Sequence, residues 1–269
     1  MPLNPISNPD IFIEASQWYR SETLTALRKA YIELIRDHQI PYADNILKTN
    51  DWLNYCYYCC LVKALASGPE ALIIDWGGLY GHITMILQNM GMQKVFNYLL
   101  HHSSHYALFQ ERFGIPTLWG REPNRLNLDS QSADIFLSSG VLEHVREDGQ
   151  GDEAVILNEI RRVLKEHGLL FIWNLPAKLG SSELLAIAAG KWHHQYRYWK
   201  RDMVRLLENA GFEILCWDKQ KFLPGAVMHK LADNLDPVRL LKWDNTLSHW
   251  FPFNLLARDF IFIARKRPA

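Results

Sequence analysis

The sequence predicts an α/β protein with a mostly parallel sheet of seven strands, an antiparallel last strand, helices on both faces and an N-terminal helical lid. Three observations predict this class. From Ala71 onward, short apolar runs alternate with amphipathic stretches, the pattern of a parallel sheet covered by helices. Before that residue, the patterns are helical. The length of 269 residues, 48% hydrophobic and 22% charged, suits one large domain with an appendage.

Residues 1–68 are expected to form the helical lid. In residues 21–38, apolar side chains recur on one face at helical spacing, and Ser21 is placed to cap the first turn. A second helix is expected over residues 51–67, ending before Gly68 and a proline. Aromatic side chains just before the first helix could close over a ligand or could pack as ordinary core.

The four cysteines are interpreted as packing residues. Cys56, Cys59 and Cys60 fall at i, i+3 and i+4 of an apolar helical stretch, and Cys216 stands alone. Without a second Cys/His pair at ligand spacing, the cluster does not indicate a metal site. We therefore expect buried thiols.

Seven strands are expected after residue 70, from the apolar runs ALIID, KVFNYLL, PTLW, ADIFLS, LLFIWNLP, FEILCW and DFIFIARK. Between the fourth and fifth runs, residues 153–167 form an amphipathic helix, with Gly168 as its left-handed terminating residue. The last two strands are expected to pair antiparallel. Residues 223–253 form a long insertion between them, which we expect to cover a site.

The charge balance excludes some classes of partner. The 29 basic and 29 acidic residues cancel, so the sequence gives no electrostatic footprint for nucleic acid or for an anionic membrane. No apolar run approaches the ~20 residues of a spanning helix. The first residues contain no secretory signal pattern. We expect a cytoplasmic protein.

A glycine-rich turn, Asp75-Trp76-Gly77-Gly78-Leu79-Tyr80-Gly81, follows the first expected strand. Ligands of open α/β sheets bind beyond the carboxyl ends of the strands, and a glycine turn lets the backbone approach them closely. The dinucleotide fingerprint is not matched, because Leu79 interrupts the glycine spacing. By itself, the turn is a weak signal for a cofactor site, and a tight structural loop is the alternative.

The segments "SSGVLEHV", "LNEIRRVLK" and the following "GLLFIWNLP" resemble the second half of class I S-adenosylmethionine-dependent methyltransferases. The resemblance is greatest to the small-molecule branch typified by quinone-biosynthesis enzymes, and it runs from about Ala71 to Cys216. It implies a Rossmann-like fold over residues 69–269. It also implies S-adenosylmethionine as cofactor, S-adenosylhomocysteine as product and a small-molecule acceptor.

The resemblance assigns cofactor roles to residues of this chain. The turn takes the place of the family's D-x-G-x-G-x-G motif along the methionine part, with Leu79 at the middle glycine, which requires a side chain that points away from the ligand. After the fourth strand, the family places small residues against the cofactor. The expected cofactor-binding residues on these two segments are Asp75, Gly77, Gly78, Gly81, Ser138, Ser139 and Gly140.

Two departures from the family pattern concern the adenosine side. The family has an acid at the end of the second strand for the ribose hydroxyls, but no Asp or Glu lies between Met92 and Gln110. His101 could accept that hydrogen bond, or could simply face solvent. After the third strand, Glu122 keeps the family's acceptor for the adenine amino group, although Arg121 replaces a glycine. A surface Arg–Glu pair is the alternative.

The acceptor side is expected to carry histidines. Methyl transfer from a sulfonium is an in-line displacement, and a phenol or alcohol acceptor also needs a base with a pKa near neutrality. His144, at the rim after the fourth strand with Glu143, and His193 or His194 in an aromatic-rich segment are the catalytic candidates. No metal site is expected, because the adjacent His193 and His194 point in different directions.

The sequence therefore predicts methyl transfer to a small organic acceptor at oxygen, nitrogen or carbon, with aromatic residues favouring an apolar or aromatic acceptor. Two alternatives stay open. One is a catalytically silent scaffold or binding protein, favoured by the departures at Leu79, at Arg121 and at the second strand. The other is a non-methylating enzyme with the same cofactor. The oligomeric state is also open, with a homodimer as one option.

Overall fold

The computed structural model describes residues 5–41, 43–147, 151–232 and 234–268. In this part of the chain one sheet contains seven strands, in the order β3-β2-β1-β4-β5-β7-β6. Strand β7 is antiparallel to β5 and β6, and the other neighbours are parallel. The predicted fold class is confirmed. The strands are β1 (Leu72–Trp76), β2 (Lys94–Leu99), β3 (Thr117–Trp119), β4 (Ala133–Ser139), β5 (Leu164–Pro176), β6 (Phe212–Gln220) and β7 (Asp259–Lys266).

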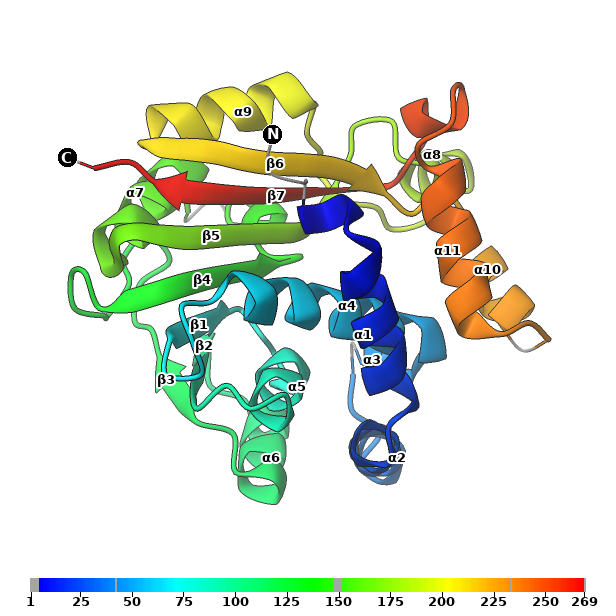
Figure 1. Ribbon diagram of the computed structural model, residues 1–269, viewed down its shortest axis with the longest axis horizontal. Coiled ribbons are helices and arrows are strands. Elements are labelled where there is room, and N and C mark those ends of the chain that lie inside the picture. Colours follow the sequence, from blue (N-terminus) through cyan, green and yellow to red (C-terminus); the bar gives the residue numbers. More distant parts are fainter. Residues whose placement is uncertain (1–4, 42, 148–150, 233, 269) are drawn as a thin grey trace.

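Helices cover both faces of this sheet (Figure 1). Successive residues of β1 point to opposite faces, so that Ile73 belongs to the apolar cluster under α1, α2, α4, α5 and α6, and Ile74 to the cluster under α7 and α9. The helices are α1 (Pro9–Arg20), α2 (Glu22–Asp37), α3 (Asp44–Leu47), α4 (Thr49–Leu65), α5 (His82–Asn89), α6 (Ser104–Phe113), α7 (Glu153–Val163), α8 (Ser181–Ala188), α9 (Lys200–Asn209), α10 (Gly225–Ala232) and α11 (Pro237–Leu247).

Residues 1–68, expected as the lid, contain one more helix, α1, before the two that the sequence pattern indicated. Asn8 caps α1 by accepting a hydrogen bond of 3.0 Å from the Asp10 amide, and Pro9 occupies the first helical position. The expected cap of α2 is confirmed, since Ser21 Oγ accepts from the Leu24 amide at 3.2 Å. A single serine therefore ends one helix and begins the next.

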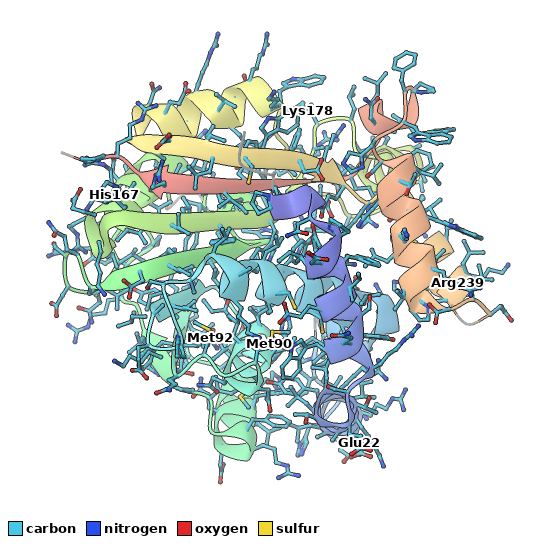
Figure 2. All side chains as sticks on the ribbon, viewed as in Figure 1. Glu22, Met90, Met92, His167, Lys178 and Arg239 are labelled. Atoms are coloured by element: carbon cyan, nitrogen blue, oxygen red, sulfur yellow. The ribbon has the colours of Figure 1, made fainter. Side chains whose placement is uncertain are left out.

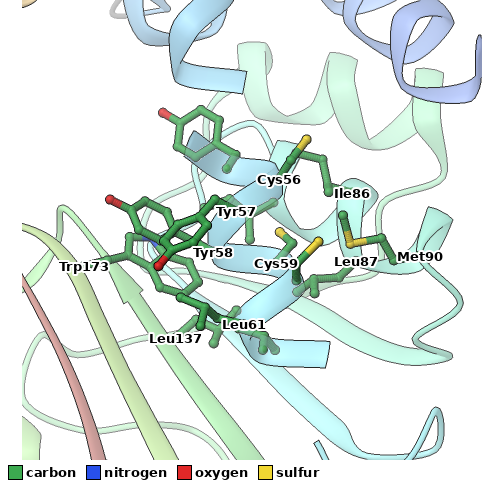
Figure 3. Packing of buried hydrophobic residues seen from close by; sticks show 14 of the residues in the cluster. Cys56, Tyr57, Tyr58, Cys59, Leu61, Ile86, Leu87, Met90, Leu137 and Trp173 are labelled. Carbon is green, nitrogen blue, oxygen red and sulfur yellow. The ribbon is translucent and has the colours of Figure 1, made fainter. Parts of the chain in front are cut away.

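Helix α4 is the central helix of the lid and is buried nearly all around. The Tyr58 ring stacks on Trp173 of β5, with centroids 4.8 Å apart and planes inclined by 11°. Figure 3 shows Cys56 and Cys59 on the opposite side of α4, facing Ile86 and its neighbours on α5. All four cysteines are buried and free, which confirms the packing interpretation. A helix that is apolar on all sides requires such enclosure.

The predicted end of the helix over residues 153–167 was wrong. Helix α7 ends at Val163, and Leu164 already pairs with Ala133 of β4. Gly168 lies inside β5 and does not terminate the helix. Strand pairing with β4 therefore determines where the helix stops, and a local glycine pattern could not reveal it.

The described part of insertion 223–253 contains α10 and α11, which lie beyond the edge of the sheet where β6 ends (Figure 1). Both helices pack against α4. Charged side chains such as Glu22, Lys178 and Arg239 project from the outer surface (Figure 2). Among the described residues, no helix combines the length and apolarity needed to cross a membrane.

Candidate active site

A cavity of about 500 Å³ lies at the carboxyl ends of β1, β4 and β5, between the glycine turn, α4 and the insertion helices. Of the residues predicted for a site, it brings together Gly77, Gly78, Ser139, Gly140, His144 and His194. The further polar lining residues are Lys48, Asp51, Asn54, Tyr55, Tyr80, His82, Glu143, Asn174, Lys221, His229, Asp244, Arg258 and Asp259.

Glycine is required at two positions of the turn. Gly77 and Gly81 have φ angles of +67° and +70°, and a Cβ on either would lie 2.7 Å from a methyl carbon of Val141 or Ile115, respectively. The left-handed backbone region and these close contacts both exclude a side chain. Gly77 N–H donates to the carbonyl of Tyr98 on β2 at 2.8 Å, which fixes the start of the turn.

Leu79, at the middle of the turn, adopts a φ of +46° and lies among the residues that line the cavity. A buried residue of β2 holds the turn at this point, since Asn97 Nδ2 donates to the Leu79 carbonyl at 3.2 Å. Tyr31 of α2 donates its hydroxyl to the Tyr80 carbonyl at 3.0 Å. The lid and the turn are thereby connected by a buried hydrogen bond.

Left-handed residues other than glycine gather at this cavity. The described chain has six of them, and three, Leu79, Asn174 and Lys221, line it. Each such residue costs of order 1 kcal/mol or more, and such strain persists mainly where function needs the geometry. The cavity is therefore a stronger candidate site than its shape alone indicates.

Asp75 lies beneath the turn and is absent from the cavity lining. It is fully buried, and Thr84 Oγ1 donates to its Oδ2 at 2.9 Å. Desolvation raises the pKa of Asp75 to about 6 despite that hydrogen bond. A Cβ on Gly78 would lie 2.5 Å from the same carboxylate oxygen. Asp75 thus supports the turn from below.

His82, the first residue of α5, was not singled out from the sequence. Its ring lies 4.4 Å from that of Tyr55 and 6.3 Å from that of Trp52. Neither ring nitrogen has a hydrogen-bond partner among the described residues. Desolvation lowers the pKa of His82 to about 3, so this cavity residue is neutral at physiological pH. Only its position directly after Gly81 could have signalled it.

The two candidate histidines that line the cavity lie side by side, although they are fifty positions apart in the chain. Their ring centroids are 5.4 Å apart. His144 Nδ1 is 2.6 Å from Glu147 Oε2, and His194 Nδ1 is 2.8 Å from Glu183 Oε1. Burial opposes the charged form of His194, but the hydrogen bond and charge of Glu183 outweigh it and raise its pKa.

Glu143 lies next to these rings and is 1% exposed. Desolvation raises the pKa of its carboxyl group to about 8. His193, by contrast, is exposed, lies outside the lining, and has its Nδ1 3.2 Å from the Lys191 carbonyl. Of the two adjacent histidines, the cavity therefore includes only His194.

The predicted adenosine-side residues do not line this cavity. His101 and Glu122 are both exposed, and Glu122 lines a separate hollow of about 660 Å³ with Arg121 and Arg125. The neighbour of His101, His102, stacks on Trp119 at the end of β3, with ring centroids 3.7 Å apart. Ser138 is buried, directly before the lining residue Ser139.

A group of charged residues at the ends of β5, β6 and β7 was also missed. Lys221 Nζ lies 3.1 Å from Asp259 Oδ2, and it also donates to Asn174 Oδ1. Asp244 of α11 accepts hydrogen bonds of 2.9 and 2.6 Å from the amides of Phe222 and Leu223. No sequence motif marks these residues, because tertiary structure alone brings them together.

The lid reaches the cavity through α3 and α4, and not through the aromatic residues suggested from the sequence. Tyr19 is 8% exposed within the core, and Trp18 packs against the same cluster. Neither lines the cavity, whereas Ile46 and Tyr55 do.

Residues 74–172 match a family model described as a methyltransferase domain. No curated protein sequence matches the chain. Among solved structures, the [4+2]-cyclase SpnF is similar with 16% identity, covering 81% of this chain and 83% of its own, at a TM-score of 0.54. A second is the 1,6-didemethyltoxoflavin-N1-methyltransferase of Burkholderia thailandensis, solved with 1,6-didemethyltoxoflavin and S-adenosylhomocysteine. It has 16% identity, coverages of 92% and 90%, and a TM-score of 0.53. At these identities, the likeness shows the Rossmann-like fold alone.

Proposed function

We propose that this chain, which carries a methyltransferase domain over residues 74–172, transfers a methyl group from S-adenosylmethionine to a small organic acceptor. The observation that carries the proposal is one cavity in which the glycine turn and the end of β4 meet the histidines 144 and 194. The S-adenosylhomocysteine in the Burkholderia thailandensis enzyme supports the choice of cofactor. The resemblance in sequence favours the small-molecule, quinone-biosynthesis-like branch.

On the cofactor side, the turn from Gly77 to Gly81 would hold the methionine part, with Asp75 beneath it. The N–H groups at the start of α5 suit a carboxylate. Ser138, Ser139 and Gly140 would contact the cofactor from β4. The adenosine would extend towards the ends of β2 and β3, where His101 and Glu122 remain the proposed polar partners.

On the acceptor side, we expect an apolar or aromatic molecule with one nucleophilic atom. Ile46, Tyr55 and Met228 contribute apolar surface to the cavity. Lys221 and Asp259 on the same wall satisfy one another, at 3.1 Å, and so need no charge on the acceptor. Residues 1–68 and 223–253 would act as lid and cover, excluding water from the reaction.

The chain's own contribution would be alignment and proton removal. The bound cofactor supplies an electrophilic methyl group on sulfur. The acceptor atom would form a bond to that carbon as the carbon–sulfur bond breaks, and the acceptor proton would pass to a base of the chain. The proposed base is His194, with His144 as its neighbour, because Glu183 fixes the tautomer and orientation of the His194 ring through Nδ1. His193, the remaining candidate, lies outside the cavity lining.

Transfer of a labelled methyl group to a panel of hydrophobic phenols and hydrophilic amines tests this function. We expect labelled product with phenols, and we expect His194→Ala to lose turnover by roughly 10²–10⁴-fold, the usual contribution of a general base. S-adenosylhomocysteine should bind this variant as well as the wild type. A clear preference for amines would refute the proposed acceptor class.

No acid lies between Met92 and Gln110, where the family has one for the ribose hydroxyls. The same experiment therefore also tests the two alternative functions, a non-methylating enzyme and a scaffold or binding protein. Cofactor binding without methylation of any acceptor would favour a non-methylating enzyme, as SpnF is named a cyclase. No cofactor binding at all would favour a scaffold or binding protein.

A further inference from the structure

We propose that Glu143, His144 and His194 form a binding site for one divalent transition-metal ion, with Zn²⁺ as the ion to test. One ligand atom from each residue lies within 4.8 Å of the other two. Among the described residues, no other group of three or more His, Cys, Asp or Glu side chains meets this condition. Two imidazoles and a carboxylate are a donor set that suits zinc and its first-row neighbours.

The hydrogen bonds around the two histidines provide an independent argument. The Nδ1 atoms of both rings are engaged by carboxylates, Glu147 at 2.6 Å and Glu183 at 2.8 Å. This arrangement leaves Nε2 as the free nitrogen of each ring. Metal-binding histidines characteristically donate their other N–H to a carboxylate or carbonyl, which sets the tautomer and the ring orientation. Here both rings have that support.

The third ligand is a carboxylate in an unusual position. Glu143 is 1% exposed, and no salt bridge to an arginine or lysine is present among the described residues. A buried carboxylate is costly unless it is paired, hydrogen-bonded or bound to a metal. The Glu143 carboxyl group accepts a hydrogen bond from its own backbone N–H, and a cation between Glu143 and the two rings would supply a countercharge as well.

Only a small rearrangement is needed to close the site. Zinc–nitrogen and zinc–oxygen bonds are about 2.0–2.2 Å, so the ligand atoms of a tetrahedral site lie about 3.4 Å apart. The ligand atoms of Glu143, His144 and His194 lie within 4.8 Å of one another, so they need to approach by at most roughly 1.4 Å. The side chains of His144 and His194 are 39% and 23% exposed, and these partly exposed rings can rotate towards Glu143.

Three protein ligands leave a coordination position open, and all three residues line the cavity that also contains the glycine turn. If the proposed methyl transfer is correct, the open position suits an oxygen of the acceptor. Coordination would lower the pKa of a bound hydroxyl, so that its proton could pass to solvent water before the oxygen attacks the methyl carbon. In that case the ion takes over the activation proposed above for His194 as base, and His194→Ala loses turnover because it loses the ion; metal-free protein with His194 intact distinguishes the two roles.

The site is tested by metal binding alone, without cofactor or acceptor. Full-length protein is stripped with chelator, dialysed against Zn²⁺ and assayed for bound metal. Co²⁺ replaces Zn²⁺ in a parallel sample for its visible absorption spectrum. We expect one ion per chain. We expect loss of that ion and of the cobalt spectrum in His144→Ala and His194→Ala. His193→Ala, the neighbouring exposed histidine, is the matched control and should retain the ion.

Glu183→Gln distinguishes a metal site from ordinary histidine packing. It removes only the orienting carboxylate, and we expect it to weaken Zn²⁺ binding by about 10–100-fold without abolishing it. Circular dichroism verifies that each variant is folded. Absence of a stoichiometric ion in the wild type would overturn the proposal. The proposal would also be overturned if His144→Ala and His194→Ala bound the ion as well as the wild type does. Methyl transfer that survives in metal-free protein would leave the ion unconnected to the reaction, whereas an ion bound without any methyl transfer would contradict only the proposed function.

Discussion

Replacing Gly77 by alanine tests whether the glycine turn is fixed by its neighbours. Gly77 has a φ of +67°, and a Cβ there would lie 2.7 and 2.9 Å from the two methyl carbons of Val141. A left-handed residue other than glycine costs about 1–2 kcal/mol. Overpacking a closely packed interior adds about 1–3 kcal/mol. We therefore expect Gly77→Ala to lower the free energy of unfolding by about 2–5 kcal/mol, measured by urea denaturation.

Two further variants separate these contributions. Gly114 has nearly the same φ, +65°, but a Cβ there would meet nothing within 4 Å. Gly114→Ala should therefore cost only the backbone contribution, about 1–2 kcal/mol. Val141→Ala removes both methyl groups that the new Cβ would meet. The double variant with Gly77→Ala should thus cost about 1–3 kcal/mol less than the sum of the single variants. Strictly additive costs, or equal costs for Gly77→Ala and Gly114→Ala, would refute the reasoning.

Three more predictions concern the same turn. Leu79→Gly should lower the dissociation constant of S-adenosylmethionine in calorimetry by about 3–10-fold, because it removes a side chain from the lining of the cavity; unchanged affinity would contradict this. Asp75 has a pKa of about 6 in the folded protein, above its unfolded value of about 3.9, so wild-type stability should fall as pH rises through this range, by up to about 1.4 kcal/mol per pH unit. Asp75→Asn should lack that loss in urea denaturation, and identical pH profiles would count against it. Tyr31→Phe deletes the hydrogen bond to the Tyr80 carbonyl, so it should lower the free energy of unfolding by about 1 kcal/mol and weaken cofactor binding. Tyr57→Phe is the control. It deletes a buried hydroxyl that is bonded far from the turn, and it should leave cofactor binding unchanged.

Most of the fold could be predicted from the sequence because its signals are local. Apolar runs of strand length placed all seven strands close to their observed positions, and Ser21 was correctly identified as a helix cap. Where pairing between distant segments determined the outcome, the prediction failed. Helix α7 ends where Leu164 joins the sheet, and the pattern around Gly168 carried no sign of it.

The site could be predicted only where one short segment contains it. The turn at Gly77 and the small residues at the end of β4 could be proposed from the sequence because each lies within one short motif. The pairing of His144 with His194, and the contact of Lys221 with Asp259, join segments far apart in sequence. No spacing rule connects such residues, so their grouping required the structure.

The central claim, a cofactor site at the glycine turn, is tested most directly by calorimetric titration with S-adenosylhomocysteine, which needs neither the acceptor nor a metal. We expect one molecule to bind per chain, and we expect Gly77→Arg to abolish binding in a protein that remains folded by circular dichroism, because its side chain would fill the turn. An absence of binding by the wild type at millimolar concentration, or equal binding by Gly77→Arg, would contradict the account.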